Sequence, residues 1–242
     1  KSKRSTWAPV AIIERVGADT ARWFVLSDSP PERDMEWTEA GVAGAARFAQ
    51  RLFRLVRTVA ESVPTQPSCP ADLAPQADAL RRATHRTIAA VTEALECFAI
   101  NVAVARIHEL TSALADAEKT ADATGMGFAR REAARTLCLL CAPMMPHLAE
   151  EMFAQLEPGS TMVVEQPWPE ADPSLLAATQ VTIAVQIMGK LRGTIEAAPD
   201  EDKDAVVARA EAEPNVARLL EGKRIVKRVH VPNRIVNFVT AG

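Results

Sequence analysis

The 242-residue sequence has few cysteines, no long apolar run and no signal region at its start. Its cysteines, Cys69, Cys97, Cys138 and Cys141, are irregularly spaced, which is typical of a reducing cytoplasm rather than a disulfide framework. No segment reaches the ~20 uncharged apolar residues that a membrane helix needs, and the chain begins without methionine. We therefore expect a soluble, cytoplasmic part of a larger protein, with no membrane contact.

An excess of positive charge is also missing, because the formal net charge is -3 at pH 7. Any binding of nucleic acid must then come from local clusters of lysine and arginine. Hydrophobic residues make up 48% of the chain, enough to bury one good core and a second, smaller one. The composition thus predicts two modules.

Complete catalytic motifs are absent as well. The sequence contains no GxSxG, HExxH or P-loop pattern, and His85 and His108 have no paired nucleophile. Cys138 and Cys141 form a CxxC pair near His147, but no second CxxC exists and both cysteines fall in a strongly apolar helical segment. We expect buried thiols, no metal site and no complete active site.

Apolar spacings of three and four predict helices over most of the first 157 residues. A helix over 9–16 ends at Gly17, and Asp19 or Thr20 can cap the next one. Thr38 is a possible N-cap for a long third helix. Further helices follow to about residue 156, and prolines 143 and 146 split the last of them. The pattern favours a bundle of four or five helices.

The remaining residues change character twice. Prolines return between 158 and 178, around Trp168, which indicates a boundary held by an aromatic anchor. Residues 181–187 then alternate between apolar and polar, as in a half-buried strand. A hairpin partner, a helix opened by an acidic run and two more strands complete a module of about 65 residues. The fold class is mainly α with a small α/β domain.

Positive charge gathers in two places. Arg47, Arg51, Arg54 and Arg57 form a stripe along the third helix, for which a solvated face is the default interpretation. The end of the chain is richer in cations, while residues 196–213 hold most of the module's acids. The terminal cations are Arg218, Lys223, Arg224, Lys227, Arg228 and Arg234.

This segregation suits contact with a phosphate backbone. Lys190 and Arg192 join the same surface if the sheet brings the two ends together. Phe238 is the lone aromatic candidate for stacking on a base, so the module is expected to read shape and phosphates rather than base sequence.

Several motif runs carry a family resemblance. The opening Lys-Ser-Lys-Arg-Ser-Thr is similar to the end of a KMSKS signature, with Lys1 and Ser2 as its last two letters. Residues 13–22 (IERVGADTAR), 29–37 (SPPERDMEW) and 141–151 (CAPMMPHLAEE) match further family stretches. With 185–193 (VQIMGKLRG) and 231–239 (VPNRIVNFV), the chain resembles bacterial-type leucyl-tRNA synthetases, class I enzymes, along its whole length.

The resemblance implies a parent enzyme that joins leucine to tRNA(Leu) in two steps with ATP. Lys1 and Ser2 would belong to the catalytic signature loop, where Lys1 stabilises charge on the ATP phosphates. The partners would be tRNA(Leu), leucine and ATP, with the protein a monomer. The catalytic domain, its HIGH-type motif and the editing domain are not in this sequence, so we expect no activity from the chain alone.

The resemblance also implies a division of the chain. Residues 1–37 would be the signature-loop remnant and connective segment, 38–157 an anticodon-binding-type helical bundle, 158–177 a linker, and 178–242 a terminal domain that grips the tRNA elbow. The tRNA-binding candidates are then Lys190, Arg192, Lys223, Arg224, Lys227 and Arg228, with Arg47, Arg51 and Arg54 on the bundle.

One departure from the family has a physical consequence. The first hairpin turn of the terminal module carries Met188-Gly189 where the family has Asn-Gly, and methionine tolerates positive φ less well than asparagine. A type I′ turn is therefore doubtful here, and another turn or a bulge is expected.

Two other interpretations compete with this one. The chain could be a free-standing helical adaptor that binds RNA or protein, or the same region of a valyl- or isoleucyl-type synthetase. Salt-dependent binding of tRNA separates the first from the main hypothesis, and competition among purified tRNAs separates the second.

Overall fold

We describe the protein from a computed structural model, over residues 9–28, 33–177 and 181–241. Lys1 and Ser2 lie outside these residues. The chain divides into two compact units, Lys1–Leu176 and Ala177–Gly242. The described helices include none long and apolar enough to cross a membrane.

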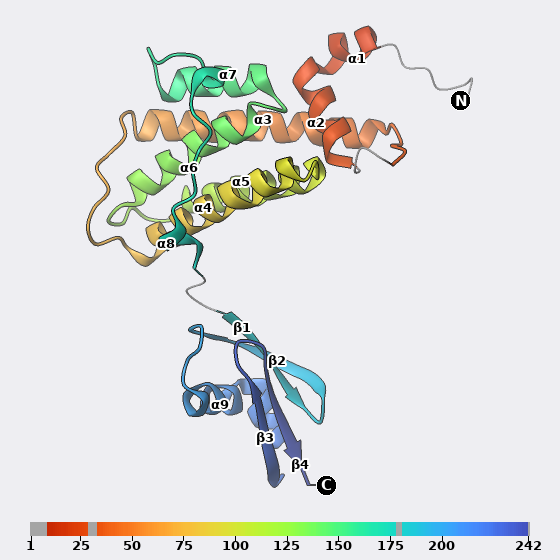
Figure 1. Cartoon of the computed structure of the whole chain (residues 1–242), viewed down its shortest axis with the longest axis vertical. Helices are drawn as coiled ribbons and strands as arrows, with labels where there is room; N and C mark the ends of the chain where they lie inside the picture. Colours follow the sequence, from red (N-terminus) through yellow and green to blue (C-terminus); the bar gives the residue numbers. More distant parts are fainter. Residues whose placement is uncertain (1–8, 29–32, 178–180, 242) are drawn as a thin grey trace. The chain divides into compact units, whose positions relative to one another are not determined.

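The first unit is helical, as the periodicity predicts (Figure 1). Helices α3–α7 form its bundle, α2 packs against α3 and α5, and α1 packs on α2. Its elements are α1 (Pro9–Val16), α2 (Ala18–Asp28), α3 (Glu39–Ser62), α4 (Pro75–Glu96), α5 (Ile100–Ala117), α6 (Met126–Cys141), α7 (Pro146–Leu156), η1 (Val163–Glu165) and α8 (Pro173–Leu176).

Local sequence explains where the long helices begin. Thr38 is the N-cap of α3, and its hydroxyl accepts a hydrogen bond from the Gly41 N–H at 3.2 Å, as the sequence predicts. A proline occupies the first turn of both α4 and α7, where its missing N–H costs no helix bond. The break between α6 and α7 lies just before Pro146, so the predicted split is confirmed.

Two adjacent arginines of α6 bind the carboxyl ends of three other helices. Arg131 is 2% exposed and donates hydrogen bonds to the carbonyls of Val63, after α3, and Leu156, at the end of α7. Arg130 donates to the carbonyl of Ala117, the last residue of α5, at 2.7 Å. Because helix carboxyl ends leave carbonyls unpaired and partly negative, these buried guanidinium groups hold the bundle's ends together.

Residues 158–176 pack onto the bundle and belong to the first unit. The indole Nε1 of Trp168 donates to the Thr92 hydroxyl of α4 at 2.8 Å, which confirms the predicted aromatic anchor. Further along, the backbone N–H of Asp172 donates to Nδ1 of His85, also on α4, at 3.0 Å. Asp172 then accepts from the Ser174 N–H and opens α8.

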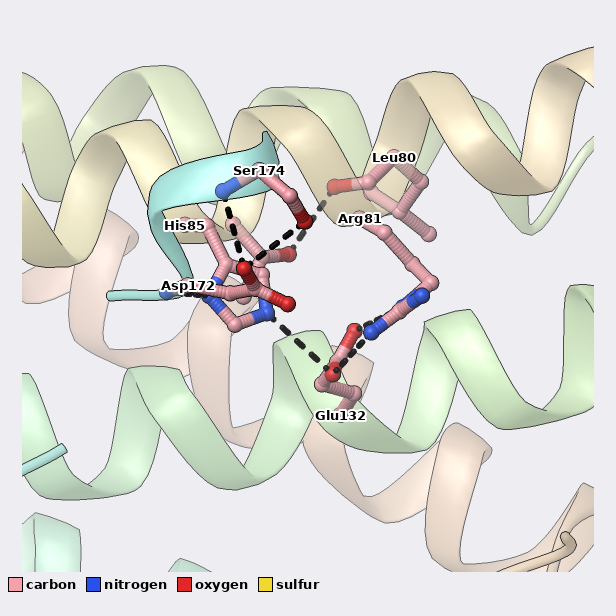
Figure 2. A network of polar contacts seen from close by, with 7 residues as sticks. Leu80, Arg81, His85, Glu132, Asp172 and Ser174 are labelled. Carbon is pink, nitrogen blue, oxygen red and sulfur yellow. Dashed lines mark hydrogen bonds and ion pairs between the residues drawn. The ribbon is translucent and has the colours of Figure 1, made fainter. Parts of the chain in front are cut away.

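Figure 2 shows that this contact belongs to a larger polar network. Nε2 of His85 lies 3.3 Å from a carboxylate oxygen of Glu132 on α6, and Nε of Arg81 donates to the other oxygen at 3.0 Å. The imidazole accepts from Asp172 through Nδ1, so its proton is on Nε2, facing Glu132. The network therefore joins α4, α6 and the segment that leads out of the first unit.

The second unit is a four-stranded sheet of order β2-β1-β4-β3 with two helices on one face. Strand β1 runs antiparallel to β2 and parallel to β4, and β3 runs antiparallel to β4. The predicted strands are present, while α10 is an additional helix. Its elements are β1 (Val181–Ile187), β2 (Lys190–Ala197), α9 (Lys203–Ala212), α10 (Pro214–Leu220), β3 (Ile225–Val231) and β4 (Ile235–Thr240).

The hairpin between β1 and β2 corrects one prediction. Met188 and Gly189 both have positive φ, 51° and 77°, which is the backbone of a type I′ turn despite the methionine. The expected bulge is present as well, because Val185 pairs with Gly193 and the next pair skips Arg192. The Asn215 side chain of α10 donates to the carbonyl of Arg192 at 2.6 Å and so holds the bulge.

Candidate nucleic-acid interface

Five of the predicted tRNA-binding cations lie toward one end of the second unit's sheet. Within the described residues, none of the five side chains has an ion pair or a hydrogen bond with the protein. All five are exposed. They are Lys190, Arg192, Lys223, Arg224 and Lys227.

The sheet topology explains why these residues gather. Ile187 at the end of β1 pairs with Lys190 of β2 on one side and, in parallel, with Phe238 of β4 on the other. The Ala241 N–H after β4 donates to the carbonyl of Arg224 before β3 at 2.9 Å. At ~4.8 Å per strand, the four strands carry these cations across roughly 14 Å at one end of the sheet. The sheet thus brings Lys190 and Arg192 to the same end as Lys223, Arg224 and Lys227, which is the arrangement that the predicted basic surface requires.

Two other cations of the unit are paired with carboxylates. The Arg228 guanidinium pairs with the Glu211 carboxylate of α9 at 3.0 Å, and that of Arg209 pairs with Glu201 at 2.7 Å. In β3, successive side chains point to opposite faces, so Arg228 faces the helices and Lys227 the open side. Arg228 is therefore locally neutralised.

Two further predicted cations fall outside the group. Arg218 of α10 donates to the Asn215 side chain at 2.8 Å. Arg234 lies in the turn between β3 and β4, where its N–H donates to the Val231 carbonyl and its own carbonyl accepts from Ala184. That turn is at the opposite end of the sheet from the β1–β2 turn.

The expectation for Phe238 is wrong. Its ring is 0% exposed and packs in the core with Val185 and Val236, so it cannot stack on a base. The exposed apolar side chains near the five cations are instead Met188, Leu191 and Val226, at 58%, 62% and 63%. Contacts through charge and shape remain the chemistry that this surface offers.

The arginine stripe on α3 is present, and all four side chains are exposed. Arg51 donates to the Ser112 hydroxyl of α5 at 3.4 Å, and Arg57 lies 3.6 Å from Glu61 in the next turn. Arg47 and Arg54 have no side-chain partner among the described residues. The stripe thus offers two free guanidinium groups and two that are partly engaged.

An aromatic stack supports the amino-terminal half of this stripe. Trp23 of α2 stacks on Phe48 of α3 at 4.9 Å between centroids, and the His108 ring of α5 lies 3.8 Å from the Phe48 ring. The Arg51 guanidinium lies 6.0 Å above the Phe48 centroid. Burial, with the nearby positive charge of Arg51, lowers the pKa of His108, so the ring is held in its neutral form.

The CxxC pair has no reactive character. Both thiols are fully buried in α6, and burial raises the pKa of Cys138 and of Cys141 far above the ordinary range. His147 is on α7 and contacts Asp19 rather than either thiol. Among the described residues, no group of three or more histidine, cysteine, aspartate or glutamate side chains could hold a metal ion.

Some contacts of the bundle could not be expected from the sequence. The prediction that Asp19 or Thr20 caps the second helix is wrong, because α2 begins at Ala18, and the Asp19 carboxylate instead accepts from the Leu148 N–H of α7 at 2.6 Å. Glu132 likewise meets Arg81 and His85, which lie one turn apart on α4, only in three dimensions. No spacing rule connects such positions, since 129 residues separate Asp19 from Leu148.

Comparison with known proteins agrees with this architecture. The family model for the anticodon-binding domain of tRNA ligase matches residues 78–207. A leucine–tRNA ligase from Gluconobacter oxydans is 69% identical over all of this chain, and one from Granulibacter bethesdensis is 60% identical over all of it. The chain spans 27% and 28% of these two relatives' lengths.

Two solved structures resemble the chain to different degrees. The crystal structure of a LeuRS–tRNA–LeuAMS ternary complex from Agrobacterium radiobacter has a TM-score of 0.77 and 28% identity, covering 98% of this chain and 30% of that one. Free methionyl-tRNA synthetase from Mycobacterium tuberculosis has a TM-score of 0.52 and 18% identity, covering 69% and 41%, and shares the fold alone.

Proposed function

Because the chain belongs to the tRNA-ligase family that this anticodon-binding domain defines, with bacterial leucine–tRNA ligases as relatives, we propose that it binds tRNA(Leu) through its two basic surfaces. The first surface is the free end of the sheet, formed by Lys190, Arg192, Lys223, Arg224 and Lys227. The second is the α3 stripe of Arg47, Arg51 and Arg54.

The observation that carries the proposal is that the five cations at this end of the sheet have no side-chain partner among the residues that the structure describes. Carboxylates are close enough to neutralise Arg209 and Arg228 in the same unit, yet no carboxylate of residues 9–28, 33–177 or 181–241 pairs with these five. Unpaired cations at one end of a sheet can bind a line of phosphates, whose counterions are released on binding. Stacking partners are absent from the described surface there, so binding through the backbone and shape is favoured.

The activity of the longer protein is part of the same proposal. Such a ligase would use ATP to activate leucine and then transfer it to the terminal ribose of tRNA(Leu), and Lys1 and Ser2 would serve its signature loop. The protein would act as a monomer in the cytoplasm, where the exposed thiols of Cys69 and Cys97 stay reduced. We expect no aminoacylation by the chain alone.

A competition experiment tests the proposal. The chain is bound to labelled tRNA(Leu) at several salt concentrations and challenged with unlabelled tRNAs for leucine, valine and isoleucine. We expect tRNA(Leu) to compete best and the affinity to fall steeply with salt. Equal competition by all three tRNAs would contradict the leucine assignment, while salt-independent or absent binding would favour a protein-binding adaptor.

A further inference from the structure

One carboxylate belongs to the first turn of a helix and also contacts the first turn of a second helix that is far away in sequence. Asp19 is in the first turn of α2, and its Oδ2 accepts from the Leu148 N–H of α7 at 2.6 Å. Its Oδ1 lies 3.1 Å from Nδ1 of His147 and forms an ion pair with Arg22. The Asp19 side chain is only 13% exposed, so water competes little for these bonds.

The amino end of α7 needs this partner. Its N-cap residue, Met145, has no side chain that can accept a hydrogen bond, and Pro146 has no N–H. Leu148 is the third residue of the helix, whose N–H an N-cap side chain ordinarily binds. Asp19 supplies that acceptor from another helix, and its negative charge is favourable at both helix amino ends.

The contact does more than attach α2 to the bundle. Trp23, which is 1% exposed and stacked on Phe48, already holds the middle of α2 against α3 through apolar contact. Asp19 instead fixes the amino end of α2, where the chain arrives from α1. It also joins two of the motif runs, 13–22 and 141–151.

We propose that Asp19 is a positioning residue for tRNA-dependent leucylation. It holds α1 and α2 in one frame with the bundle that carries the arginine stripe, so that bound tRNA keeps a fixed relation to α1, through which the chain would connect to the rest of the proposed ligase. The inference rests on the proposed function, because it concerns the ligase that contains this chain. Small displacements of reacting groups lower kcat strongly, and such a frame prevents them.

Three variants separate positioning from stability. Asp19→Ala removes the cap and the bridge together, and Asp19→Asn keeps one oxygen acceptor but loses the charge. Asp19→Ala with Arg22→Gln and His147→Glu places a new acid in the first turn of α7 and also removes the α2 guanidinium that lies 3.2 Å from His147, so the favourable charge is restored without an ion pair to α2. Glu109→Gln is the control, since it removes an exposed carboxylate whose ion pair, with Arg106, stays within α5.

The experiment measures three quantities for each variant. Melting temperature and the hydrogen exchange of α1 and α2 are followed in the chain, and kcat and KM for tRNA in the full-length ligase. We expect Asp19→Ala to melt lower, and the triple variant with Arg22→Gln and His147→Glu to recover the melting temperature. In both, α1 and α2 should exchange faster and kcat should fall by about tenfold or more at unchanged KM.

The outcomes are distinguishable. If kcat recovers together with the melting temperature in the triple variant, or never changes, Asp19 is only structural and the inference is overturned. If the wild-type chain does not bind tRNA, the proposed function fails, whatever the Asp19 variants do. Glu109→Gln should leave all three quantities unchanged.

Discussion

The backbone N–H of Asp172 donates to Nδ1 of His85, which joins the proline-rich segment after the bundle to the middle of α4. Only an unprotonated Nδ1 can accept this bond, so the opposite nitrogen carries the proton and faces Glu132. One buried imidazole thus links three parts of the first unit.

Replacing His85 should destabilise the first unit. His85→Ala leaves the Asp172 N–H without its partner and removes a donor from Glu132, so we expect the free energy of unfolding to fall by about 1–3 kcal/mol. Urea unfolding measures it. Thr92→Val is the matched comparison, because it removes the hydrogen bond of Trp168, whose ring is 37% exposed and can be hydrated. A smaller loss for His85→Ala than for Thr92→Val would contradict this account.

The same network predicts the acid limb of the stability curve. Burial alone would raise the pKa of Glu132, but hydrogen bonds from His85 and Arg81 outweigh it and lower that pKa. A carboxyl with a lowered pKa in the folded state adds stability above its unfolded pKa of about 4.3, and that stability is lost as pH falls through the folded pKa.

Glu132→Gln should therefore flatten the decline in stability below about pH 4.3. Urea unfolding as a function of pH measures this decline. Glu109→Gln, which changes an exposed carboxyl, serves as the control. An acid limb of equal steepness in Glu132→Gln and in the wild type would be incompatible with the ion-pair network.

His108 should also make stability depend on pH, but at higher pH than Glu132 and through a group that is neutral in the folded state. Burial and then Arg51 lower its pKa, so the unfolded state binds a proton more readily than the folded one. Stability from this group is complete above about pH 6.5, the unfolded value, and is lost as pH falls from there toward the folded pKa. His108→Gln should remove this part of the pH dependence, measured between pH 5 and 8. A wild-type curve flat over that range would show that His108 is not held neutral.

The Met188 turn predicts a stabilising substitution. Because Met188 has φ of 51°, Met188→Asn should slow hydrogen exchange of β1 and β2 by relieving up to about 1 kcal/mol of strain. Met188→Leu is the control, because leucine tolerates positive φ as poorly as methionine does. Exchange that is equal or faster in Met188→Asn would argue against strain at this position.

Much of the fold could be predicted because its signals are local. The bounds of α1, the Thr38 cap and the period-two pattern of β1 follow from neighbouring residues. The short α10 and the type I′ turn at Met188 were not predicted, since the first has no long periodicity and the second opposes the residue's own preference.

The candidate interface was predictable only in outline. Charge segregation indicates a basic surface, but Lys227 and Arg228 are neighbours in sequence and point to opposite faces. Which of them is neutralised depends on the position of Glu211 on α9, and that depends on how the helix packs. The alternation of Val236 and Phe238 did contain a local signal that both are core residues.

The most direct test of the central claim compares free cations with paired ones. Lys223→Glu with Arg224→Glu reverses two charges at the free end of the sheet, and Arg209→Gln with Arg228→Gln removes two that are paired with carboxylates. The measurement is the dissociation constant for tRNA(Leu) as a function of salt. We predict that the first double variant binds weakly and has a salt slope reduced by about 2, roughly 1 for each lost phosphate contact, while the second keeps the wild-type slope. Equal slopes in all three proteins, or a loss confined to the second variant, would contradict the assignment of this surface to tRNA.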